Sequence, residues 1–398
     1  MRHDKIPVAL IAMMFFTIGI MFCMNDILLP VVKDVFHLNY FEATSIQASF
    51  YIVYLLWPLL ISKSIEKYGY RKNIIGSMII CIIGCLFFLP AYQLESFPLI
   101  LLGVFIMSTG ITVINVAANP YAALLGSPDG THVRLNFVQA FSRIGYATTP
   151  IVASYLIYFM GKNNPQIHVP YLIVAILISI VIIFMVILKL PDFKPARSAN
   201  KTLALGLFKE CLQHKKLFFG IPVMFFYVGA ESGTAGFFIN YMTSHNQSTH
   251  SAATFLTFYY ILAAFFALFG AFLLRFIKAS ILLSVFGIGM IPCYFIIIWG
   301  PSSIAPYALI GAGGFLSIMF PTVFGLSIEN LNDFTERGSA LLNFAIVGGA
   351  IFPPLQGWIA DEWNISLSYI IPCLCIVVVT VYGIWISAIE RSSIKYKT

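Results

Sequence analysis

Residues 189–216 read KLPDFKPARSANKTLALGLFKECLQHKK, and this basic, polar stretch decides how the rest of the chain is organised. It is the only long polar segment in a chain that is 60% hydrophobic. On both sides of it, apolar runs of roughly 20 residues recur, the length that crosses a bilayer core of about 30 Å. We therefore predict a cytoplasmic linker at 189–216 between two membrane-embedded halves, residues 1–188 and 217–398.

Each half is predicted to hold six membrane spans. The expected fold class is an all-α membrane protein with twelve transmembrane helices in two pseudo-symmetric six-helix halves. The spans are placed at about 6–32, 41–62, 73–93, 97–124, 135–158, 168–188, 217–241, 252–274, 279–299, 304–328, 338–360 and 366–389.

The distribution of Lys and Arg sets the predicted orientation. With the N-terminus inside, 20 of the 23 basic residues fall in cytoplasmic segments, whereas the outer loops hold only Lys33 and Lys162. Cytoplasmic loops of membrane proteins carry such an excess, so both termini are expected to be cytoplasmic, in the plasma (inner) membrane. The net charge of +7 then reflects topology, and no nucleic-acid partner is expected.

The two halves repeat short sequences at matching places. MFFTIG at 14–19 corresponds to MFFYVG at 224–229, and Gly145 and Gly348 each lie eleven residues after an arginine. Duplicated halves with a binding site between them are typical of secondary transporters. One chain then supplies both halves of a pathway, so a monomer is expected, with a small-molecule solute and the lipid bilayer as its partners.

Three charged residues fall inside predicted spans, namely Asp26, Arg143 and Glu231. A mid-bilayer arginine costs roughly 2.5–3.5 kcal/mol on insertion scales, and such residues usually face a cavity or a partner. Arg143 lies about 13.5 Å along the helix beyond Arg134, which is too deep for its side chain to reach the cytoplasmic surface easily. We expect Arg143 to face a central cavity and to pair with either carboxylate or with an anionic solute; a fixed structural ion pair is the alternative.

The carboxylates are also the candidates for cation coupling. All seven histidines fall at span ends or in loops, so proton transfer through the membrane would depend on Asp26 and Glu231. The seven cysteines show no CxxC pair, and no metal site or cofactor is expected. HExxH, GxSxG and phosphate-loop motifs are missing from the sequence, so an enzyme, and with it a set of catalytic residues, is not expected.

Polar side chains within the spans supply candidate solute ligands. Amides offer both donors and acceptors, which suits the hydroxyls of a neutral sugar, although amides also hold helices together. The residues predicted to bind solute are Asn25, Gln47, Tyr51, Asn115, Asn119, Gln139, Ser142, Arg143 and Tyr227.

The turn SKSIEKYGYRK at 62–72 resembles the major facilitator signature G-x-x-x-[DE]-[RK]-x-G-x-[RK]-[RK], with Ser62 in place of the leading glycine. The glycine permits a tight turn, and the charges can hold helix ends together in one state of a rocking cycle. Simple anchoring by positive charge is the alternative. The predicted conformational latch comprises Glu66, Lys67, Gly69, Arg71 and Lys72.

Longer stretches resemble the fucose/glucose–galactose permease family of sugar symporters. They are NDILLP at 25–30, AANPY at 117–121, RLNFVQAF at 134–141, SIMFPTVFGL at 317–326 and IVGGAIFPPLQGWIAD at 346–361. YVGAE at 227–231 is more similar to the glucose/galactose branch. The resemblance implies a major facilitator fold and cation-coupled sugar import by alternating access.

Two positions depart from the family pattern. Asn115 stands where fucose permeases carry a glutamate thought to take part in proton coupling, and Ser142-Arg143 stands where Asn-Ser is common. The leading hypothesis is thus an importer of a hexose or related small polyol, coupled to protons or, alternatively, to sodium. The other hypotheses are an importer of an anionic solute bound through Arg143 and a non-transporting nutrient sensor.

Overall fold

The computed structural model describes residues 5–125, 131–159, 166–188, 191–193, 211–329, 331 and 335–395. Every regular element in these ranges is a helix, which confirms the all-α fold class. Most of the predicted linker lies outside the described residues. The described chain divides into two compact units, unit 1 with 5–38, 45–193 and 249–257, and unit 2 with 39–44, 211–248 and 258–395.

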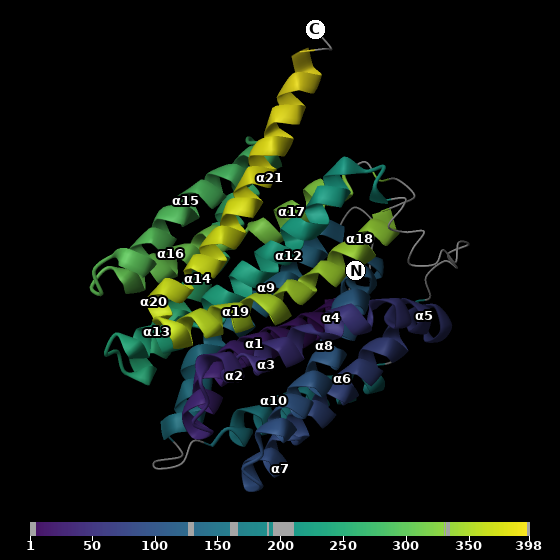
Figure 1. The fold of residues 1–398 in the computed structure, drawn as a ribbon. Coiled ribbons are helices and arrows are strands. Elements are labelled where there is room, and N and C mark those ends of the chain that lie inside the picture. Colours follow the sequence, from purple (N-terminus) through teal and green to yellow (C-terminus); the bar gives the residue numbers. More distant parts are fainter. Residues whose placement is uncertain are drawn as a thin grey trace. The chain divides into compact units, whose positions relative to one another are not determined.

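Unit 1 is a bundle of helices drawn from purple to teal in Figure 1. Within it α1 packs along α9, and α6 packs along α8 and α10. Its elements are α1 (Lys5–Val35), α3 (Ser45–Tyr51), α4 (Val53–Leu56), α5 (Pro58–Tyr68), α6 (Tyr70–Leu86), α7 (Phe88–Gln93), α8 (Phe97–Leu124), α9 (Thr131–Ser154), the π-helix η2 (Tyr155–Phe159) and α10 (His168–Ile187), with the first residues of α14.

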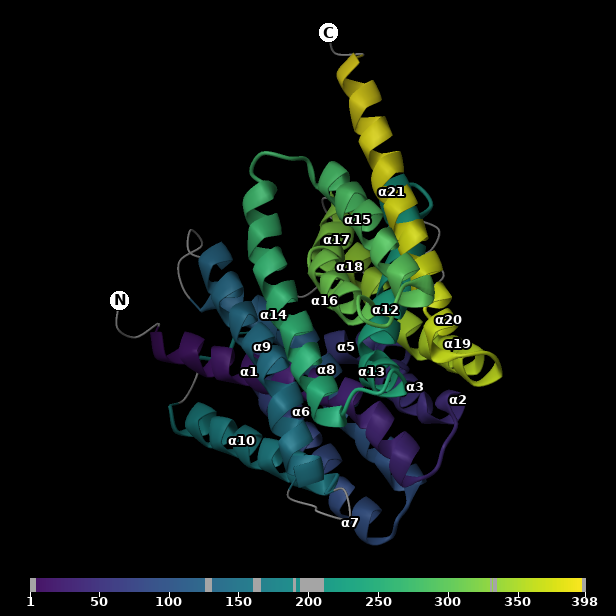
Figure 2. The same ribbon diagram turned by 90° about the vertical axis from the view of Figure 1, so that its left-hand side faces the viewer.

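Unit 2 contains the green and yellow helices that Figure 2 shows from a second direction. Here α12 packs against α17, α19 and α21, and α15 packs against α16 and α21. Its elements are α2 (Tyr40–Ala43), α12 (Lys215–Gly236), α13 (Phe238–Ser244), most of α14 (Thr249–Leu273), α15 (Ala279–Trp299), α16 (Ala305–Leu316), α17 (Met319–Ile328), α18 (Thr335–Phe344), the 3-10 helix η4 (Ala345–Val347), α19 (Gly348–Glu362), α20 (Ile365–Ser368) and α21 (Ile370–Lys395).

Ten of the predicted spans appear, within the described residues, as helical stretches long and apolar enough to cross a membrane. The predicted span 41–62 is instead divided, since α4 ends at Leu56 and α5 begins at Pro58, with Trp57 between them. Proline has no backbone N–H to continue the preceding helix, and it is well suited to the first position of a new one. The predicted span 135–158 is α9, whose Pro150 precedes the π-helix η2. Its polar residues, Arg143 among them, lower the hydropathy of this span.

The short helix α2 belongs to unit 2 although the residues on both sides of it belong to unit 1. Asp361 at the end of α19 holds it there: the two carboxylate oxygens accept hydrogen bonds of 2.8 Å from the backbone N–H groups of Tyr40 and Phe41. Gly357, one turn earlier on α19, touches the backbone of Tyr40. The first turn of a helix leaves its N–H groups without internal partners, so this carboxylate satisfies two of them.

The glycines that the two halves share lie where helices cross in each unit. In unit 1, Gly145 of α9 lies against the backbone of Phe16 and Gly19 on α1. In unit 2, Gly348 at the start of α19 lies against the backbone of Phe225 on α12. Small residues let membrane helices approach closely, so each unit builds an equivalent pair of spans from an equivalent glycine.

We expect Gly145→Ala to lower the melting temperature of the purified protein in detergent, because the new Cβ would collide with the Phe16 carbonyl oxygen. Overpacking of this kind costs about 1–3 kcal/mol. Gly76→Ala is the matched control, since a Cβ at Gly76 in α6 meets nothing within 4 Å. An equal fall in melting temperature for both variants would contradict the close crossing.

Candidate functional site

Three of the predicted site residues form one hydrogen-bonded chain in unit 1. Asn25 and Asp26 lie on α1, and Gln47 lies on α3. The Asn25 Nδ2 group donates to Gln47 Oε1 over 2.6 Å, and Gln47 Nε2 donates to Asp26 Oδ1 over 3.3 Å. All three side chains are buried, with Asp26 8% exposed. A buried carboxylate is tolerated when it is hydrogen-bonded, and here a glutamine on the next span supplies such a bond.

A second polar contact joins the predicted spans 41–62 and 97–124. Asn115 Nδ2 on α8 donates to the Tyr54 hydroxyl over 3.1 Å, and the Tyr54 ring lies 6.3 Å from that of Tyr51. Tyr54 is not among the residues predicted to bind solute. Its spacing of three residues from Tyr51, which puts both on one helical face, was the available signal. The side chain of the predicted ligand Asn119 lies outside the described residues.

The candidates on α9 differ in exposure. Gln139 is exposed, whereas Ser142 and Arg143 are half-buried. The Ser142 backbone touches Gly19 of α1. The backbone of Arg143, the next residue, therefore lies near Gly19 along α1. Asp26 lies seven residues, and so about 10 Å along the helix axis, beyond Gly19. The cationic and acidic candidates of this unit therefore lie on crossing helices at different depths.

In unit 2 the predicted residues Tyr227 and Glu231 lie one turn apart on α12. The buried Tyr227 hydroxyl donates to Glu231 Oε1 over 2.8 Å and lies 3.3 Å from the Leu316 carbonyl oxygen. Glu231 itself is exposed. The tyrosine thus orients an acid that remains accessible from outside the unit. This pair belongs to unit 2 and the Asn25–Gln47–Asp26 chain belongs to unit 1, so each is described within its own unit.

The signature turn is built around Gly69, whose φ of +83° is in the region that favours glycine. A Cβ there would lie 2.6 Å from Asp192 Oδ1. The backbone N–H of Arg71 donates to the same oxygen over 3.4 Å, and that of Tyr70 donates to the Phe193 carbonyl over 3.0 Å. The turn therefore docks onto residues 191–193 at the start of the predicted linker.

Other signature residues are less constrained. Glu66, Lys67 and Lys72 are exposed, and Lys67 Nζ lies 5.0 Å from the centroid of the Tyr68 ring. Sequence reasoning missed Asp192 as the acid that meets this turn. No local pattern could reveal it, because 121 positions separate it from Arg71.

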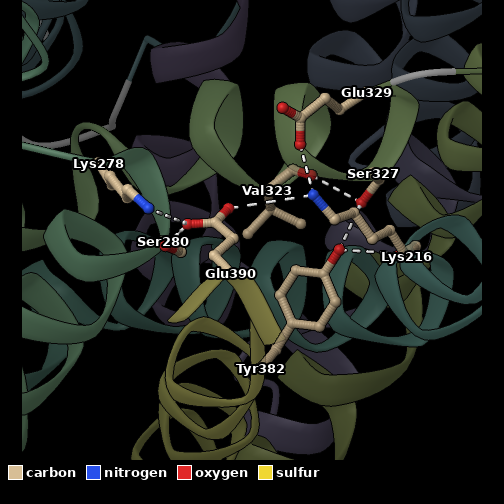
Figure 3. A network of polar contacts seen from close by, with 8 residues as sticks. All are labelled: Lys216, Lys278, Ser280, Val323, Ser327, Glu329, Tyr382 and Glu390. Carbon is tan, nitrogen blue, oxygen red and sulfur yellow. Dashed lines mark hydrogen bonds and ion pairs between the residues drawn. The ribbon is translucent and has the colours of Figure 1, made fainter. Parts of the chain in front are cut away.

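Four helix ends of unit 2 meet in a charged network that the sequence analysis also missed. Lys216 at the start of α12 contacts Glu329 and lies 4.0 Å from Glu390, which lies 3.9 Å from Lys278 (Figure 3). The Tyr382 hydroxyl donates to the Lys216 carbonyl oxygen over 2.9 Å. The sequence analysis used the basic residues only to assign the cytoplasmic side and gave the two glutamates no role. In the folded unit these ion pairs join the ends of α12, α15, α17 and α21.

Within the described residues, no group of three or more His, Cys, Asp or Glu side chains could hold a metal ion. The Asn25–Gln47–Asp26 chain and the Tyr227–Glu231 pair present carboxylates, amides and a tyrosine hydroxyl. Such groups can form hydrogen bonds with the hydroxyls of a solute.

The Major Facilitator Superfamily model matches residues 9–347. The chain belongs to the major facilitator superfamily. Membership confirms the twelve-helix fold class and the resemblance of the 62–72 turn. Among its relatives, a glucose/galactose transporter of Brucella abortus is 32% identical over 383 residues, which are 94% of this chain and 92% of that protein. The L-fucose-proton symporter of Escherichia coli is 27% identical over 96% of this chain and 93% of its own length.

Solved structures agree with the fold of this major facilitator protein. The crystal structure of a variant of the E. coli fucose:proton symporter aligns with a TM-score of 0.71 at 25% identity, over 96% of this chain and 98% of the other. A nucleoside transporter aligns with a TM-score of 0.73 at 15% identity, over 95% and 99%. The Brucella abortus glucose/galactose transporter and the E. coli symporter confirm the predicted kinship with the fucose/glucose–galactose permease family.

Proposed function

We propose that this major facilitator protein is a secondary active importer of a hexose or related small polyol, coupled to protons and working by alternating access. The curated relatives named as glucose/galactose transporters and as a fucose-proton symporter match nearly the whole chain. The structural observation that carries the proposal is the buried chain Asn25–Gln47–Asp26, which combines amides for solute hydroxyls with an acid for the coupling proton.

The geometry of this chain suggests how a proton affects binding. An ionised carboxylate only accepts hydrogen bonds, whereas a protonated one also donates. Gln47 bonds Asp26 and Asn25 together, so a change in the charge of Asp26 alters the bonding of both amides. The Oδ1 atom of Asn25 is buried and, among the described residues, has no hydrogen-bond donor. A solute hydroxyl would supply one.

The remaining parts of the proposal concern topology. We place the protein in the plasma (inner) membrane as a monomer with cytoplasmic termini, and with residues 1–188, 189–216 and 217–398 as first half, linker and second half. The turn containing Gly69 would latch one end state through Asp192. Each half would carry its own half-site, and rocking of the halves would expose the solute to one side at a time.

A second candidate function is supported by Arg143. Its guanidinium lies on a membrane-embedded helix and is only half-buried, and arginine binds carboxylates in a bidentate manner. On this alternative the solute is a sugar acid or another carboxylate.

Uptake of a labelled solute panel into vesicles, with and without imposed proton or sodium gradients, tests the proposal. We expect an inward proton gradient to drive accumulation of a neutral hexose and a sodium gradient to have no effect. Accumulation of carboxylated solutes alone would establish the second candidate. A protein that binds solute without moving it would be a sensor.

Glu231→Gln is expected to shift the apparent solute affinity or the pH optimum of uptake more than it changes expression. The reason is that Glu231 is exposed and accepts a hydrogen bond from the Tyr227 hydroxyl. Tyr227→Phe removes the hydroxyl that contacts both Glu231 and the Leu316 carbonyl oxygen but keeps the carboxylate, so it should produce a smaller shift in the same direction. A Glu231→Gln protein that loses stability in detergent yet transports normally in membranes would indicate a structural role.

A further inference from the structure

A groove of about 430 Å³ lies between α15 and α21 at the end of unit 2 where α15 begins. Ile281, Val285 and Ile384 form its apolar wall. Val285 is 55% exposed and Ile384 is 50% exposed. Both helices are among those apolar enough to span a membrane, so exposed aliphatic side chains here face the hydrocarbon of the bilayer.

Small residues create the groove. The two helices approach closely at Gly383, where a Cβ would lie 2.8 Å from the Ser284 hydroxyl oxygen. One and two turns further along α21, Ser387, Ala388 and Arg391 line the opening. Because serine and alanine are small, the groove stays open beside α15. It extends from the apolar side chains to the guanidinium of Arg391.

The positive charge of Arg391, at the end of this groove, is not neutralised by Glu390, its neighbour in sequence. Glu390 lies on a different face of α21 and is directed towards Lys278, Ser280 and Lys216 (Figure 3). Arg391 is exposed, and none of the ion pairs between described residues includes it. The groove therefore combines an apolar wall with a cation at one end.

We propose that this groove binds an anionic phospholipid, with an acyl chain along the apolar wall and the phosphate at Arg391. The basic residues around this end, including Arg275 and Lys278, mark it as cytoplasmic. Anionic lipids of the cytoplasmic leaflet are attracted to such basic groups, and arginine matches the geometry of a phosphate. The apolar wall selects a lipid over free phosphate. This inference does not depend on which solute the protein carries.

Native mass spectrometry of the full-length protein, mixed with phosphatidylglycerol or phosphatidylcholine of identical acyl chains, tests the proposal. The wild type should retain the anionic lipid preferentially. Arg391→Gln should reduce that preference by roughly fivefold, since one basic group near a membrane surface contributes about 1 kcal/mol. Arg275→Gln is the matched control, because Arg275 is an exposed cation at the same end of unit 2 but outside the groove.

A second variant tests the apolar part. Ala388→Phe should fill the groove and reduce retention of both lipids, while the melting temperature reports whether the variant is folded. Equal losses for Arg391→Gln and Arg275→Gln would overturn the proposal, because they would indicate attraction to a diffuse basic surface. Displacement of the lipid by millimolar inorganic phosphate would also overturn it, because the acyl chain would then contribute nothing.

Discussion

Asp26→Asn is expected to abolish gradient-driven accumulation of solute while leaving counterflow exchange largely intact. Asparagine is nearly the same size and can still accept the hydrogen bond that Gln47 Nε2 makes to Asp26 Oδ1, so the buried chain keeps its packing. It cannot take up or release a proton. Solute would then equilibrate across the membrane without being concentrated.

The measurement is uptake of labelled solute into energised vesicles, compared with exchange into preloaded ones. Asp34→Asn is the matched control, because Asp34 is an acid of the same helix that lies outside the Asn25–Gln47–Asp26 chain. It should behave as the wild type. If Asp26→Asn still concentrates solute at the normal rate, Asp26 is not the coupling residue.

Arg143→Ala is expected to lower transport by about tenfold or more. Arg143 is only half-buried, so losing its charge should cost less than breaking a fully buried pair, and about 1.4 kcal/mol already corresponds to tenfold. If Arg143 acts on a coupling carboxylate, as the sequence predicts, uptake of neutral hexoses is lost as well. Arg143→Lys keeps the charge but loses the bidentate geometry, and it should retain part of the activity.

The choice of solute separates the two functions. If Arg143→Ala abolishes uptake of carboxylated solutes but spares neutral hexoses, Arg143 binds the solute and the second candidate function replaces the first. If an experimental structure shows the guanidinium in a fixed ion pair remote from any cavity, Arg143 has a structural role and both transport roles fail.

Much of the fold could be predicted from sequence because insertion into a membrane depends on local composition. Runs of apolar residues predicted the spans. The division of the predicted span 41–62 was not predicted, although the missing N–H of Pro58 is a local cause of it. The matched glycines, Gly145 and Gly348, indicated a repeat between the two halves, and the structure places each of them at a helix crossing. Each of these properties depends on a residue and its near neighbours in the chain.

The candidate site was predictable only as a set of residue types. Charged and amide residues inside apolar spans stand out individually, so Asn25, Asp26 and Gln47 could be selected from the sequence. Which of them bond to one another could not, because Gln47 reaches Asp26 through the packing of α3 on α1. Likewise, Tyr54 became a partner of Asn115 only through the packing of its span on α8.

The sequence by itself determined the membrane class, the helical spans and the polar residues worth testing, since hydropathy and charge are properties of short segments. Only the tertiary structure decided that Asp192 meets the Gly69 turn and that Lys216, Glu329 and Glu390 form one network. The physical reason is that these contacts join helix ends more than 100 positions apart. A charged residue that forms a specific contact at a helix end has the same kind of sequence neighbours as one that faces water. The local sequence therefore cannot distinguish the two.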